Sequence, residues 1–128
     1  MIDLDFAGVE ASGFRMVTPG FHTFLVTKVE DKTTEEKPHV IVTLTCQDAE
    51  EAGSTMQHRL YFHTDGAMGT AKLFLQHALN TRIEGNLSEY LTDWSDLVGA
   101  EVSGPVVHNP VGDKTYANLA IFEVAQPD

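Results

Sequence analysis

The pattern of apolar and polar positions predicts a β-hairpin over residues 39–62. Residues 39–46 are rich in β-branched side chains, and a polar, acidic turn with Gly53 separates them from the mixed run 56–62, as is typical of strand, turn and strand. One register gives an apolar face that pairs Val40, Val42, Leu44 and Cys46 with Phe62, Leu60, His58 and Met56. The other face pairs Ile41, Thr43 and Thr45 with Tyr61, Arg59 and Gln57. A slip of one residue would mix the two sets, so the pattern favours this register.

A further strand is expected over Phe21–Glu30, between the Pro19-Gly20 turn and a polar loop at residues 31–38. It allows two parities against the hairpin. In one, Phe24 and Lys28 share the face of Thr43 and Arg59. In the other, Phe24 and its neighbour Val26 point inward. A bulge in this long strand would allow both.

The second half of the chain predicts one long helix and two more strands. The expected elements are helix Ala67–Asn80, a helical turn Asn86–Leu91, a second turn with Thr92 as its cap, and strands Glu101–His108 and Lys114–Val124. Asp65 or Thr70 is the expected cap of the long helix, and Asn80 its end. Gly104-Pro105 indicates an edge strand or a bulge.

Three strands, a helix and two strands follow the order of the OB-fold, a small, partly open barrel. A chain of 128 residues is expected to form one domain. We therefore predict a mainly β domain over residues 1–128: a five-stranded antiparallel OB-fold barrel, a helix between strands 3 and 4, and an irregular arm at residues 1–18. The expected core residues are Val42, Leu44, Leu60, Phe74, Leu97, Leu119 and Ile121.

Composition adds constraints on compartment and partners. The formal net charge is −11, from 19 acidic and 8 basic residues, which opposes indiscriminate binding to polyanions. The bases are unevenly placed, because Lys28, Lys32 and Lys37 lie close together. The single cysteine, Cys46, permits no intrachain disulfide and fits a reducing compartment. With an acidic N-terminus unlike a signal peptide and no apolar run of about 18 residues, we expect a cytoplasmic protein without membrane association.

The motifs argue against an enzyme. Cys46 and the histidines His39, His58 and His63 lack the tight spacing of metal ligands, so no metal site is expected. In the hairpin register His58 opposes Leu44, as a structural histidine would. No glycine-rich phosphate loop or nucleophile turn is present, and we expect no cofactor.

Several segments resemble phage-encoded single-stranded-DNA-binding proteins. They are Pro19-Gly20-Phe21 leading into a strand that ends Lys28-Val29-Glu30, the strand Val40–Leu44 with its acidic turn, the junction Trp94–Val102, and Tyr116–Leu119. The resemblance spans residues 19–122. It implies an OB-fold protein that coats and protects single-stranded DNA during phage replication or recombination in the host cytoplasm, where phage replication or recombination proteins are further candidate partners.

Binding single strands without sequence preference needs cations along the phosphates and flat side chains under the bases. The candidates are Lys28, Lys32, Lys37, Arg59 and Lys114 for the phosphates, Phe24, Tyr61 and Tyr116 for the bases, and Thr43 and Asn118 as hydrogen-bonding neighbours. Competing interpretations place Phe24 and Tyr61 in the core and Lys32 and Lys37 in a solvated turn. The alternative function is a phage structural or acidic protein-interaction module without nucleic-acid binding, which would not need its bases clustered on one face.

Overall fold

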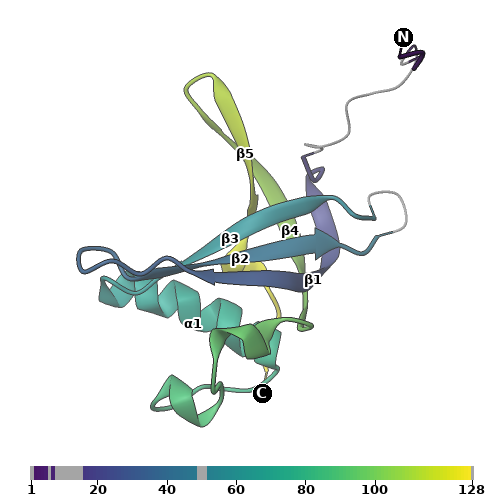
Figure 1. Ribbon diagram of the computed structural model, residues 1–128. Coiled ribbons are helices and arrows are strands. Elements are labelled where there is room, and N and C mark those ends of the chain that lie inside the picture. The colour runs from purple at the N-terminus through teal and green to yellow at the C-terminus, as the bar shows by residue number, and fades with distance from the viewer. Residues whose placement is uncertain (1, 6, 8–15, 49–51, 128) are drawn as a thin grey trace.

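The computed structural model describes residues 2–5, 7, 16–48 and 52–127, and it contains five strands and one α-helix (Figure 1). These elements are β1 Gly20–Asp31, β2 His39–Cys46, β3 Thr55–Tyr61, α1 Asp65–Leu79, β4 Glu101–Val111 and β5 Lys114–Leu119. Short 3-10 turns are η1 Leu87–Glu89, η2 Trp94–Leu97 and η3 Ile121–Glu123. The described part of the predicted arm, residues 2–5, 7 and 16–18, contains no helix or strand, and the rest lies outside the described residues.

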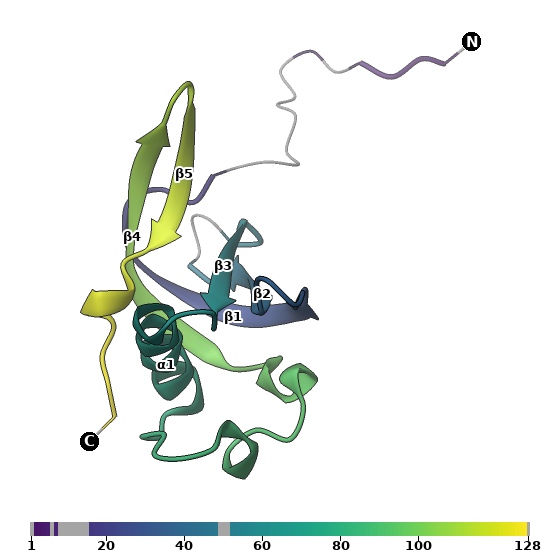
Figure 2. The same ribbon diagram turned by 90° about the vertical axis from the view of Figure 1, so that its left-hand side faces the viewer.

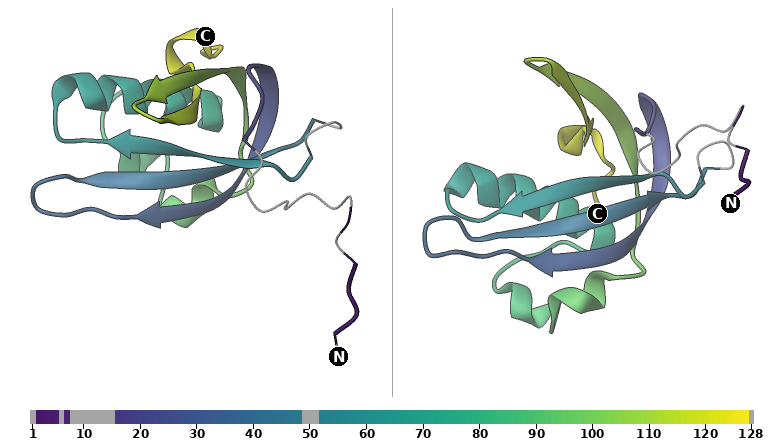
Figure 3. Two further views of the ribbon diagram at one scale, coloured as in Figure 1. Left: turned by 90° about the horizontal axis from the view of Figure 1, so that it is seen from above. Right: turned by 45° about the horizontal axis from the view of Figure 1, so that its top comes forward.

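The strands form one open antiparallel sheet in the order β3-β2-β1-β4-β5. This confirms a mainly β protein with its helix between β3 and β4. Among the described residues no ladder joins β3 to β5. α1 packs beside β3 and β4 (Figure 3), and the β4–β5 hairpin extends away from the other strands (Figures 1 and 2). No helix in the described part of the chain is long and apolar enough to cross a membrane.

The β2–β3 hairpin has the predicted faces but not the predicted pairs. Val40 pairs with Leu60, and Ile41 pairs with Arg59, so β3 is displaced by two residues from the predicted register. A slip of two residues leaves every side chain on its original face, because side chains alternate with period two. The turn sets the pairing: the Cys46 carbonyl accepts from the N–H of Gly53, whose φ is 91°.

β1 contains the predicted bulge, which lies between Val26 and Lys28. Before the bulge, Phe24 and Val26 point into the core and are fully buried. After it, Lys28 pairs with Thr43 and is exposed. The parity that placed Phe24 beside Lys28 is therefore wrong, because the extra residue reverses the alternation between them.

The helices differ from prediction mainly at their ends. α1 begins at Asp65, and its cap is Thr64, whose hydroxyl accepts from the N–H of Ala67 at 3.0 Å, rather than Asp65 or Thr70. Asn80 ends it as predicted, in the left-handed conformation with φ 51°. The later turn is capped by Asp93 instead of Thr92.

The last strand is shorter than predicted, and the chain after it packs closely against Gly104 of β4. β5 ends at Leu119 and η3 follows, so that Ile121 and Val124 return to the core. A Cβ on Gly104 would lie 2.7 Å from Val124 Cγ1 and 3.1 Å from Leu119 Cδ1. β4 is an internal strand of the sheet, not an edge strand, and the glycine provides space for this C-terminal segment.

All seven predicted core residues are buried, with exposed fractions of 6% or less. Replacing Leu44 by Ala should therefore lower the free energy of unfolding by about 2–5 kcal/mol, because it leaves a cavity beneath β2. Chemical denaturation measures the loss. Leu4→Ala, at a position 68% exposed, is the matched control and should change stability by less than about 0.5 kcal/mol. Equal effects of the two substitutions would contradict the burial of Leu44.

His58 should make the stability depend on pH. Its ring stacks on Phe74 with centroids 4.7 Å apart, and its Nε2 is buried without a hydrogen-bond partner among the described residues. Burial lowers the pKa of His58 from 6.5 to about 4. The unfolded chain binds the proton first as the pH falls, so stability present above pH 6.5 is lost between about 6.5 and 4, by up to about 3 kcal/mol.

The measurement is chemical denaturation across this pH range for the parent and for His58→Phe, which keeps a flat ring but cannot titrate. As the pH falls, the unfolding free energy of the parent should decrease more than that of His58→Phe. Any advantage of the parent in stability should therefore shrink, or the variant should become the more stable protein. His63→Phe, at an exposed position, is the control and should track the parent. An unchanged difference between parent and His58→Phe at all pH values would show that His58 does not titrate on unfolding.

Candidate nucleic-acid interface

The outer face of β1–β3 brings together several of the predicted site residues. Side chains on this face are aligned in rows across the three strands. One row contains Lys28, Thr43 and Gln57, the next contains Glu30, Ile41 and Arg59, and the third contains His39 and Tyr61. The opposite face of β2 is the buried core. We call Lys28, Thr43, Arg59 and Tyr61, together with Lys37 from the β1–β2 loop, the outer-face patch.

Two lysines of this region are paired with one carboxylate. Glu30 contacts Lys32 Nζ at 3.1 Å and Lys28 Nζ at 3.2 Å. Hydrogen bonds from Lys32 and Lys28 hold the pKa of Glu30 below its usual value, so the carboxylate stays charged. These groups are solvated, so each contact contributes little to stability. Glu30 thus occupies the ammonium groups of both lysines, which an anionic ligand would have to take from it.

Arg59 offers its guanidinium to solvent. Its side chain is exposed, and its only described polar contact is a 3.4 Å bond from Nη2 to Gln57 Oε1 on the same strand. Glu30 lies in the same row, two strands away, which corresponds to a backbone separation of about 10 Å. Among the described residues, Arg59 and Lys37 are the cations of the outer-face patch without an ion pair, and Lys37 lies over the Tyr61 ring.

Tyr61 is half-buried and already has aromatic and cationic neighbours. Its ring stacks on His39 with centroids 5.5 Å apart, and Lys37 Nζ lies 4.8 Å from the ring centroid. His63 meets it edge-on at 5.8 Å. A cation–π contact at an exposed site is worth only about 0.5–1 kcal/mol. A base that stacks on Tyr61 would therefore have to share the ring with, or displace, His39 or Lys37.

The remaining candidates lie elsewhere. Phe24 is fully buried, so its ring is core and is closed to a base. Lys114 and Tyr116 are exposed on the projecting β4–β5 hairpin, where Tyr116 is 48% accessible (Figure 2). No described contact joins these two residues to the outer-face patch.

Four of the seven bases that the structure describes gather on one side of the sheet. Lys28, Lys32, Lys37 and Arg59 belong to the β1–β3 face or its loop, while the other three lie on α1, after α1 and on the β4–β5 hairpin. Acidic residues accompany them, at Glu30, Asp31, Glu35 and Glu36. The face thus alternates in charge, and it is less acidic than the chain as a whole.

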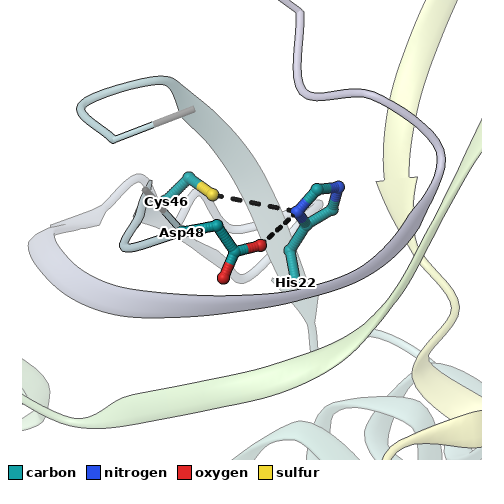
Figure 4. Close-up of side chains that lie close together, drawn as sticks. All are labelled: His22, Cys46 and Asp48. Atoms are coloured by element: carbon teal, nitrogen blue, oxygen red, sulfur yellow. Dashed lines mark hydrogen bonds and ion pairs between the residues drawn. The ribbon is translucent and has the colours of Figure 1, made fainter. Parts of the chain in front are cut away.

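A second polar cluster was not predicted from the sequence. His22 of β1 lies beside Cys46 at the end of β2 and beside Asp48 just after it (Figure 4). The Nδ1 atom of His22 lies 2.5 Å from Asp48 Oδ2 and 4.0 Å from Cys46 Sγ. These residues are separated by 24 and 26 positions along the chain, so no short motif could have indicated the cluster.

Comparison of the chain with models of protein families finds no match, and comparison with curated proteins finds none either.

Proposed function

We propose that the protein binds single-stranded DNA without strong sequence preference through the outer-face patch. The observation that carries this proposal is the bulge in β1, which presents Lys28 on the same face as Thr43, Arg59 and Tyr61. Single-strand binding requires this combination of cations for phosphates and an aromatic ring for a base. The opposite face of the same strands is apolar and forms the buried core. Packing of the core therefore does not require cations or an aromatic ring on the outer face.

The sheet order supports the proposal. We interpret β3-β2-β1-β4-β5 as an OB-type barrel opened between β3 and β5. OB-folds bind oligonucleotides on the face of strands 2 and 3 and with the loops that join strands 1 to 2 and 4 to 5. In this chain strands 2 and 3 carry Thr43, Arg59 and Tyr61, the first loop carries Lys32 and Lys37, and Lys114 and Tyr116 lie beside the second loop; Lys28 adds a cation from strand 1.

The charge of the chain shapes the expected binding. A net charge of −11 repels a polyanion at long range, so affinity depends on the local cations and falls with salt. Stacking of a base on Tyr61 would release Lys37 from the ring and make its ammonium available to a neighbouring phosphate. Together with the family resemblance, this supports a role in coating single strands during phage replication or recombination in the host cytoplasm.

A protein-interaction module is the second candidate, and one observation favours it. An apolar groove of about 620 Å³ lies between α1 and the segment that follows it, with Phe62, Met68, Leu75 and Trp94 among its walls. Apolar grooves of this kind accept peptide side chains. If the protein does not bind single strands at low salt, this candidate replaces the first.

The proposal is tested by fluorescence titration with an oligo-dT strand at several salt concentrations. Arg59→Ala should weaken binding and reduce the slope of log K against log salt by about 0.7, because it removes one phosphate contact. Arg82→Ala removes an exposed arginine outside the outer-face patch and is the matched control. Equal slopes for Arg59→Ala, Arg82→Ala and the parent would exclude Arg59 from the site.

Tyr61→Ala should have a different signature in the same titration. Loss of a stacked base costs about 1–3 kcal/mol, so affinity should fall at least about fivefold while the salt slope stays nearly constant. Tyr90→Ala, at a half-buried tyrosine of the segment after α1, is the control. Circular dichroism checks that each variant is folded. Parent-like affinity of a folded Tyr61→Ala would contradict stacking at this ring.

Glu30→Gln should strengthen binding. The substitution removes the carboxylate that pairs with Lys28 and Lys32, and it therefore leaves both ammonium groups to the phosphates. We expect a severalfold higher affinity at low salt and a steeper salt slope, by up to about 1.4 for two added contacts. Glu123→Gln changes the net charge equally at an exposed position on η3 and should have a smaller effect. Equal gains for the two variants would mean that only net charge matters.

A further inference from the structure

We propose that His22, Cys46 and Asp48 form a binding site for a divalent transition-metal ion, and that zinc is the ion that best fits their donor atoms. The inference is independent of the outer-face patch. The three side chains supply an imidazole nitrogen, a thiol sulfur and a carboxylate oxygen, which all lie within 4.8 Å of one another. Zinc in proteins is bound by this mixture of nitrogen, sulfur and oxygen ligands.

The strand register brings the three residues together. Phe24 pairs with Cys46, so the continuation of the ladder sets His22 opposite Asp48. A backbone bond from the Gln47 N–H to the Thr23 carbonyl, 2.9 Å long, extends the pairing to this point. Because side chains alternate, His22, Cys46 and Asp48 all point to the same side of the two strands (Figure 4).

The histidine is oriented as a metal ligand would be. Its Nε2 lies 2.8 Å from the backbone carbonyl of Thr18, which can only accept a hydrogen bond. Nε2 therefore carries a proton. Nδ1 faces Cys46 and lies 2.5 Å from the Asp48 carboxylate, so without a metal a proton lies between Nδ1 and Oδ2, and an ion bound at Nδ1 would displace that proton. Metal-bound histidines in proteins commonly donate their other ring N–H to a carbonyl in this manner, which fixes the tautomer and the ring orientation.

Metal binding requires a change in the distances between the donor atoms, and the Asp48 carboxylate is the group that can move. Donor atoms on a tetrahedral zinc ion lie about 3.3–3.7 Å apart, given bonds of about 2.0–2.3 Å. The His22–Asp48 separation of 2.5 Å is shorter than this, and the His22–Cys46 separation of 4.0 Å is slightly longer. The Asp48 side chain is 37% exposed and can move outward, whereas the His22 side chain is only 11% exposed.

Burial and charge also favour a cation. Cys46 is 1% exposed, so the sulfur lies in the protein interior. Metal binding would release the thiol proton, and the resulting thiolate together with the carboxylate carries two negative charges, which a divalent ion neutralises. The exposed side of Asp48 provides the route of entry. Three protein ligands leave a fourth position for water.

The test uses the full chain, stripped of metal with a chelator and then titrated with Co²⁺ and with Zn²⁺. Co²⁺ should bind at one equivalent and give the thiolate-to-cobalt charge-transfer absorption of a cysteine ligand, and Zn²⁺ should displace it. Zn²⁺ should also raise the melting temperature, because an ion bound to the folded state stabilises it. Absence of one-equivalent binding, or of the charge-transfer band, overturns the proposal.

Variants assign the ligands. Asp48→Asn and His22→Gln should each weaken Co²⁺ binding by at least about tenfold, since even changes beyond the direct ligands cost about 10–100-fold. Asp31→Asn and His63→Gln are the matched controls and should bind like the parent. Cys46→Ser should abolish the charge-transfer band.

Because Cys46 is buried, Cys46→Ser can also unfold the chain, and the exposed ligand Asp48 then decides the question. If a folded Asp48→Asn binds Co²⁺ like the parent, the proposal fails. It also fails if Asp48→Asn lowers the melting temperature equally with and without Zn²⁺, because His22 and Asp48 would then form only a structural ion pair.

Discussion

The bulge in β1 is the constraint on which both the core and the candidate site depend. Before it, Phe24 and Val26 fill the interior, and after it Val29 takes over the inward position while Lys28 turns outward. If β1 ran through Thr27 as a regular strand, without a bulge, Lys28 would continue the inward series of Phe24 and Val26. An ammonium group in that position would be buried without a partner, at a cost of several kcal/mol. The bulge thus allows one strand to serve two faces.

Contacts from distant parts of the chain hold the bulge in place. The Val26 N–H donates to the Ala100 carbonyl, and the Gly99 N–H donates to the Val26 carbonyl, both at 2.8 Å. Gly99 has a φ of 98°, which a residue with a Cβ rarely adopts. The hydroxyls of Thr27 and Thr45 form a 2.9 Å hydrogen bond across the strands. The two bonds of Val26 continue the pairing of β1 with β4 beyond Leu25 and Glu101, and they fix the residue at which the bulge begins.

The two proposed sites use opposite sides of the same pair of strands. Thr43 and Thr45 face outward, while Leu44 and Cys46, one position along in each case, face the interior. On the outer side, Glu30 pairs with the same lysines, Lys28 and Lys32, that the proposed function assigns to phosphates. On the inner side, His22 and Asp48 join the first strand to the turn after the second. A substitution that shifts β1 or β2 therefore alters both proposed sites.

The sequence by itself determined the element order, the helix and the seven core residues. It also determined which residues of β2 and β3 share a face, since these properties follow from local periodicity and from the burial of apolar surface.

Only the tertiary structure decided the rest. Periodicity is unchanged by a slip of two residues, so the turn at Gly53 had to set the pairing of Ile41 with Arg59. The inward position of Phe24 depends on a bulge held by residues more than 70 positions away in the chain. The cluster of His22, Cys46 and Asp48 arises where two strands meet, because a contact between residues so far apart depends on the register of the strands and leaves no trace in local spacing.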